Sequence, residues 1–433
     1  MLNKDFKFFG QTRQQIQLHL QCYAERFAYG FFLITLAFSQ ISIAGTQIAL
    51  AFCLLFFVLH AWINRTALAG SGVGTSYVVF VLALALSSVL SEYPWASLFN
   101  LRKLGLIIIL YLTMWLINGR RRLLWSHAVL ALSLAIMGIF EIVRSTLEDT
   151  RLRWATHGIT VTYGVVIMMS LLMLLAVRSS FRQELHAAGR SEFFLEKFYF
   201  TLLLLVIAVA FILAGVRSAL LGLSLGSLIL AALKERRLLI YFFLTLLLVI
   251  VASPPDLQER LIDMFDVQGD KSVNGRLLQW QTGWRIFVAQ PWLGWGWRDL
   301  VELYPAFAPA GADLGKHPFH IGHVHNNFLQ MAITGGSIGL GAFVWLLVTI
   351  GKKLYLAWRH IPDSYLRDTV LGAFCAFIGY LLASFFDWSF ADEEITMALW
   401  LIVGLGFAAE RMARIEQYGN VDIINKVQRS EQL

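Results

Sequence analysis

Two histidines and two amides stand together at the edge of a long apolar run, in His323-Val324-His325-Asn326-Asn327. Polar and ionisable side chains at the end of a membrane helix are costly and mark a functional site by default. His325 is the natural base of the group, because imidazole can take up a proton near neutral pH. The two asparagines could orient it or bind a polar substrate, and the alternative is a helix cap.

Two arginines upstream could hold an anion. Arg217 falls between two apolar runs, near the start of a short span, and Arg276 follows the turn signal Asn274-Gly275 at the start of a Trp-bearing helix. A helix start attracts anions, and a guanidinium group can grip a phosphate by two hydrogen bonds. The alternatives are a snorkelling anchor for Arg217 and a solvated surface charge for Arg276.

Asp387 ends a later apolar run. It could hold His325 in one tautomer, pair with an arginine, or belong to a plain acidic turn. We expect no metal site, because His323 and His325 are two positions apart and would face apart on a helix, and no third ligand follows nearby. No cofactor-binding motif is present.

The composition is that of a membrane protein. Of the 433 residues, 58% are hydrophobic and only 15% are charged, whereas a soluble chain carries about 25% charged residues. We therefore expect an all-α polytopic membrane protein, in contact with membrane lipids. The net charge of +7 needs no nucleic-acid partner, since basic cytoplasmic loops account for it.

Hydropathy predicts about 12 transmembrane helices. They lie near residues 27–44, 46–63, 75–91, 104–118, 123–143, 157–177, 198–214, 217–233, 238–253, 327–350, 368–386 and 394–410. With both termini in the cytoplasm, the cytoplasmic segments hold about two-thirds of the 35 Lys and Arg residues, as the positive-inside rule requires.

The predicted organisation has four parts. Residues 1–253 hold nine spans, 254–326 form a large external loop domain, 327–410 hold three spans, and 411–433 form a cytoplasmic tail. In the loop, helices are expected over 254–265 and 275–290. Trp280 and Trp284 share one face of the second helix, and Trp292, Trp295 and Trp297 follow it. Trp favours the headgroup level of a bilayer, so we expect the loop to lie on the outer leaflet. The alternative is a folded cap with Trp in its core.

Taken in order, these pieces resemble one family. Gly215-Val216-Arg217-Ser218, Asn274-Gly275-Arg276, Pro291-Trp292-Leu293-Gly294-Trp295-Gly296 and His325-Asn326-Asn327-Phe328-Leu329-Gln330 are similar to the motifs of the O-antigen ligase and O-antigen polymerase superfamily of bacterial envelope glycosyltransferases. The resemblance covers roughly residues 205–350. It implies a GT-C-like architecture in the bacterial inner membrane, with a periplasmic active site.

The resemblance also implies a reaction. Such enzymes take a glycan from undecaprenyl pyrophosphate, and the ligase transfers it to the lipid A–core oligosaccharide. Arg217 and Arg276 correspond to arginines that bind the donor pyrophosphate, and His325 to the catalytic histidine, with His323 the other candidate for the base. Asp387 corresponds to a late acidic residue. The residues agree with metal-independent, inverting transfer, since two arginines can supply the positive charge that a leaving pyrophosphate needs.

Three readings stay open for the activity. The first is the ligase. The second is a polymerase, or a protein O-oligosaccharyltransferase, of the same superfamily. The third is a transporter of lipid-linked sugars, which is disfavoured because no matching halves are visible. For an anionic acceptor, Arg144, Arg151 and Arg153 flank a further external loop, although ordinary headgroup contact explains them equally well.

Overall fold

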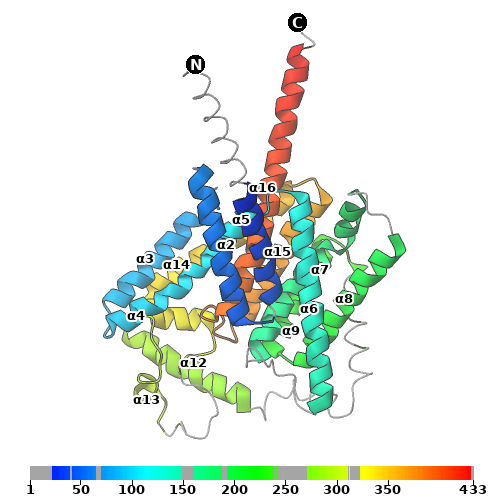
Figure 1. Ribbon diagram of the computed structural model, residues 1–433. Coiled ribbons are helices and arrows are strands. Elements are labelled where there is room, and N and C mark those ends of the chain that lie inside the picture. The colour runs from blue at the N-terminus through cyan, green and yellow to red at the C-terminus, as the bar shows by residue number, and fades with distance from the viewer. Residues whose placement is uncertain are drawn as a thin grey trace, which may run out of the picture.

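The computed structural model describes residues 22–39, 41–64, 70–148, 160–187, 193–237, 240, 243, 247, 271–310, 312 and 322–430. All regular elements among these residues are helices (Figure 1). After a helix over residues 22–38 come α2 (Ile43–Asn64), α3 (Gly74–Val89), α4 (Pro94–Asn100), the 3₁₀ helix η1 (Leu101–Ile107), α5 (Ile108–Leu116), α6 (Arg120–Glu148), α7 (Thr160–Ala187), α8 (Phe193–Ala214), α9 (Arg217–Leu233), α12 (Lys271–Ala289), α13 (Tyr304–Phe307), α14 (Asn327–His360), α15 (Ser364–Ala383) and α16 (Glu393–Ser430).

The chain is a polytopic membrane protein. Within the described ranges, seven stretches of helix are long and apolar enough to cross a bilayer, and α3, α9 and residues 200–214 of α8 are shorter apolar helices. The expected span 217–233 coincides with α9. The expected span 104–118 is the second half of a longer path in which η1 joins α4 to α5. The expected span 238–253 lies outside the described ranges, apart from single positions.

Charged side chains gather at one end of the bundle. The Arg120 guanidinium, at the start of α6, lies 3.0 Å from Glu184 near the end of α7 and 3.0 Å from Asp363 before α15. It also lies 2.8 Å from Glu416, late in α16. These four segments were all expected on the cytoplasmic side. The structure places all four segments at one end of the bundle, as is required of segments that share one side of the membrane.

The opposite end carries the start of α9 beside the end of α15, because glycines let the two helices touch. A Cβ atom on Gly226 would lie 3.0 Å from the Cys375 carbonyl oxygen, and one on Gly379 would lie 2.8 Å from the Gly222 carbonyl oxygen. Small residues at membrane helix interfaces permit such close approach. The pairing is antiparallel. The first residue of α9, Arg217, therefore lies at the end of the bundle where α15 finishes.

The Trp-Gly segment 291–297 fills a break in α14. Gly336 has φ +62° and interrupts the helix, so carbonyl oxygens before it lose their helical partners. The Trp295 and Gly296 amides donate to Ile333 and Thr334 at 2.8 and 3.0 Å, and the Ser337 amide donates to Pro291 at 2.8 Å. This reciprocal pairing fixes the segment, and α12 before it, against the first turns of α14.

Replacing Gly336 by alanine should destabilise the protein strongly. The residue needs a left-handed backbone, and an added Cβ would overlap the Trp292 carbonyl group. We expect a loss of about 2–4 kcal/mol, because strain and a steric clash combine. Gly341→Ala is the matched control in the same helix, since its Cβ would meet nothing within 4 Å. Equal melting temperatures for the two variants in detergent would contradict this account of the break.

Candidate functional site

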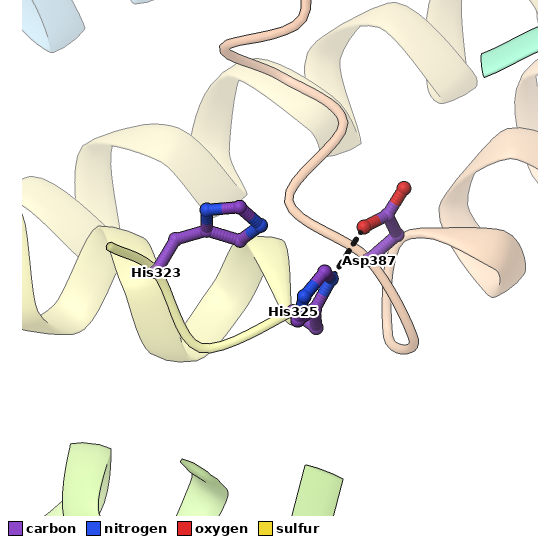
Figure 2. Close-up of side chains that lie close together, drawn as sticks. All are labelled: His323, His325 and Asp387. Carbon is purple, nitrogen blue, oxygen red and sulfur yellow. Dashed lines mark hydrogen bonds and ion pairs between the residues drawn. The ribbon is translucent and has the colours of Figure 1, made fainter. Parts of the chain in front are cut away.

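His325 and Asp387 form the centre of the candidate site. The Nδ1 atom of His325 lies 2.9 Å from a carboxylate oxygen of Asp387, and both side chains are partly buried (Figure 2). The partners are 62 positions apart. The fold joins them because Asp387 follows α15 and His325 precedes α14, and the Asn327 amide donates to the Ser384 carbonyl at 2.8 Å.

The backbone of His325 is itself unusual. With φ +44° it is the one non-glycine residue in the left-handed region among those that the structure describes. This conformation costs a side chain such as histidine about 1 kcal/mol. It turns the chain immediately before α14, and strained backbone tends to gather at functional sites.

Asn326 caps α14, as the helix-cap alternative had it, whereas Asn327 bonds to another part of the fold. The Asn326 side chain accepts hydrogen bonds from the Phe328 and Leu329 amides at 2.9 and 3.0 Å. Asn327 is fully buried. Its amide group donates to Tyr380 and Ser389 at 3.1 and 3.0 Å and accepts from the Phe390 amide. These bonds bind α14 to the α15–α16 connection and so fix Asp387 relative to His325.

His323 lies on the same side as His325. Their ring centroids are 4.3 Å apart, while the intervening Val324 is fully buried. The expectation that these histidines would face apart is wrong, because the segment is extended rather than helical. The expectation of no third ligand is wrong too. Asp387 completes a group whose nitrogen and oxygen atoms all lie within 4.8 Å of one another.

The two arginines lie near the N-terminal ends of two helices that reach this end of the molecule. Arg217 opens α9 and is partly buried. Arg276 is partly buried in the second turn of α12, which begins at Lys271, so the turn predicted at Asn274-Gly275 is wrong. One helical turn beyond Arg276, the Trp280 ring lies 6.2 Å from Phe386, next to Asp387.

The comparison with known families decides the identity of this region. The model of the family described as O-antigen ligase matches residues 202–344, roughly a third of the chain. Residues 202–344 belong to the O-antigen ligase family. No curated protein matches the chain. The chain is thus a membrane enzyme with an O-antigen ligase domain over residues 202–344. This domain contains Arg217, Arg276, His323 and His325, while the fold supplies Asp387 from outside it.

The tryptophans of the O-antigen ligase region divide between core and surface. Trp297 is only 5% exposed and belongs to the main core, and the Trp295 indole donates to the Ile286 carbonyl at 2.9 Å. Trp284 and Trp292 are 58% and 71% exposed. For Trp297 and Trp295, the alternative of a folded cap with Trp in its core is therefore right. The exposed pair still fits an outer-leaflet position.

Several expected residues are not described. Arg151 and Arg153 lie outside the described ranges, as does the helix expected over 254–265. Arg144 lies within α6, but its side chain is outside what the structure describes.

Sequence reasoning missed the carboxyl pair at the start of α16. The Thr162 hydroxyl of α7 donates to Asp392 at 2.6 Å, and the Ile395 amide donates to it at 3.1 Å. Burial, and next the neighbouring Glu394 carboxyl, raise the pKa of Asp392 to about 7. The acidic run 392–394 was the available signal, but burial cannot be read from it.

Replacing Asp392 by asparagine should change how stability depends on pH. Because folding raises the pKa of this carboxyl, its protonated form stabilises the wild-type protein at low pH, and this contribution is lost as pH rises through about 7. Asparagine cannot ionise and can still cap α16. Relative to wild type, the variant should gain about 1–3 kcal/mol between pH 5 and pH 8.5. Melting temperatures that differ by the same amount at both pH values would contradict this.

Proposed function

We propose that this protein is an O-antigen ligase. It transfers the glycan from undecaprenyl pyrophosphate to the lipid A–core oligosaccharide, by metal-independent inverting transfer at the periplasmic face of the bacterial inner membrane. The hydrogen-bonded His325–Asp387 pair carries the proposal, since it lies where the ligase family region meets the end of the bundle. An acid–base pair of this kind is what a sugar hydroxyl needs in order to attack.

The pair gives His325 one useful tautomer. With Asp387 accepting from Nδ1–H, the Nε2 atom keeps its lone pair. The acceptor hydroxyl gives its proton to Nε2 as its oxygen bonds to the anomeric carbon. The bond between that carbon and the pyrophosphate oxygen breaks, and the electron pair leaves with the carrier. One displacement inverts the anomeric centre, so no enzyme nucleophile is required.

Arg217 and Arg276 supply positive charge to the leaving pyrophosphate. Arg217 stands at the first position of α9, where the helix dipole also favours an anion. Arg276 stands on the face of α12 that leads through Trp280 to Phe386. Charge fixed in advance at the site of developing negative charge is the largest common source of rate enhancement.

The proposed membrane arrangement has about 12 spans in a GT-C-like architecture, with both termini in the cytoplasm and the loop between the ninth and tenth spans in the periplasm. Its support is the division of the bundle into two ends. The Arg120 network stands at one end, and the His325 pair stands at the other. Basic residues favour the cytoplasmic side.

In vitro transfer tests the proposal. Purified protein is given a lipid-linked glycan together with lipid A–core, a peptide acceptor or no acceptor, with and without a chelator. Product on lipid A–core, formed also with the chelator, is the expected result. Longer carrier-linked chains would instead indicate the polymerase, glycosylated peptide would indicate the protein-directed enzyme, and loss of activity with the chelator would contradict metal-free catalysis.

The basic loop near Arg144 is proposed to bind the anionic acceptor. Reversing the charge of both Arg151 and Arg153 to Glu should raise KM for lipid A–core about 10-fold or more, since two phosphate contacts are lost, and leave donor binding unchanged. Arg359→Glu, in the last turn of α14 at the opposite end of the bundle, is the control. Unchanged acceptor KM in the double variant would contradict this role.

A further inference from the structure

We propose that His323, His325 and Asp387 form a binding site for a zinc-like transition-metal ion, and that the bound ion switches transfer off. Within the described residues this group is the one in which at least three histidine, cysteine or acidic side chains lie close enough to hold an ion. The binding itself is independent of the proposed function, whereas inhibition rests on it.

The geometry brings two histidines on one side of an extended segment together with an aspartate from another part of the fold. Val324 is buried and its amide donates to the Gln330 side chain at 3.1 Å, so the backbone between the histidines is held. His323 and His325 then present their rings to the same space, 4.3 Å between centroids. Asp387 faces them from the α15–α16 connection, as Figure 2 shows. The candidate ligand atoms lie within 4.8 Å of one another, so movements of about 1 Å bring them to the roughly 2 Å bond lengths of zinc.

The ligand chemistry selects the ion. Two imidazoles and one carboxylate suit zinc and its neighbours, whereas magnesium and calcium prefer oxygen ligands alone. Three protein ligands leave a fourth position for water. All three side chains are partly exposed, so an ion can enter from the surface.

The bound ion prevents His325 from acting as a base. In the resting pair, His325 Nδ1 carries the proton that Asp387 accepts. A metal ion that binds Nδ1 and the Asp387 carboxylate takes the place of this proton, which moves to Nε2 of the same ring. The Nε2 lone pair is thereby used, so the ring has no free site for the proton of an acceptor hydroxyl.

Zinc binding is measured first, on the purified full-length protein in detergent, by competition with a fluorescent zinc chelator. We expect one ion per chain. Loss of a group that only hydrogen-bonds to a metal ligand weakens metal affinity about 10- to 100-fold. Loss of a ligand itself in His323→Ala should therefore weaken zinc affinity by more than about 100-fold. His360→Ala, which removes an exposed histidine near the other end of α14, should bind as wild type does. Equal affinity in His323→Ala and wild type, or no binding at all, would overturn the site.

Transfer is then measured with and without zinc in each variant, as a ratio within that variant. Wild type and His360→Ala should lose activity with zinc and regain it with a chelator. The zinc concentration that halves activity should rise more than about 100-fold in His323→Ala, in parallel with the lost affinity. Binding without inhibition would leave the metal site standing and would count against His325 as the base. Stimulation by zinc would overturn the inhibitory role and metal-free transfer together.

Discussion

Replacing His325 by alanine should reduce glycan transfer about 10²- to 10⁴-fold, the usual contribution of a positioned general base. The acceptor hydroxyl would lose the atom that takes its proton, while the arginines that hold the donor stay in place. The single-turnover rate with lipid-linked glycan and lipid A–core measures this loss. Donor affinity should change little, because His325 is assigned to the acceptor step.

Two further variants separate His325 from its neighbours. His360→Ala, a surface histidine, should transfer at the wild-type rate. Asp387→Asn retains the shape of the pair but favours the wrong tautomer of His325, so it should lower the rate and shift its pH profile, and Asp387→Glu should restore part of both. A nearly normal rate in His325→Ala, with a large loss in His323→Ala, would move the role of base to His323.

Replacing Arg217 or Arg276 by alanine should each reduce transfer about 10²- to 10³-fold, as removal of one fixed group that stabilises developing charge typically does. Binding of the lipid-linked donor should weaken as well, since the pyrophosphate is already charged before it leaves. Replacing either arginine by lysine should retain part of the activity, because lysine keeps the charge but cannot form the two parallel hydrogen bonds of a guanidinium group.

The control for these arginines stands on the same helix as Arg276. Arg285 is exposed on α12, and Arg285→Ala should bind donor and transfer glycan as wild type does. The Arg217→Ala, Arg276→Ala double variant should lose less than the product of the single losses, since both act on one leaving group. Losses that multiply, or normal donor affinity in both single variants, would argue that the two arginines act at separate places.

The local part of this architecture could be predicted from the sequence. Apolar runs bounded by Arg217 and Lys234, and by Asn326, gave α9 and the start of α14, because helix boundaries depend on nearby residues. The contact of Asp387 with His325 was one of three alternatives left open for Asp387, since both residues were placed at helix ends on one side of the membrane. The predicted side of the membrane limits which residues can contact each other, even when those residues are far apart in the chain.

What the sequence did not predict depends on contacts between distant segments. The glycines of residues 291–297 carried a family motif, but their pairing with the break at Gly336 needs the folded α14. Asn274-Gly275 is a turn signal in isolation and becomes helical within α12. His323 was misjudged for the same reason, because a spacing of two separates side chains on a helix and aligns them on an extended segment.

The central claim is that Arg217, Arg276 and His325 act on one bound substrate. An experimental structure of the protein with undecaprenyl-pyrophosphate-linked glycan tests it most directly. The account predicts both guanidinium groups at hydrogen-bond distance from the pyrophosphate, with His325 Nε2 facing the side of the anomeric carbon opposite the leaving oxygen. A pyrophosphate bound away from both arginines, or an anomeric carbon that His325 cannot approach through an acceptor hydroxyl, would contradict it.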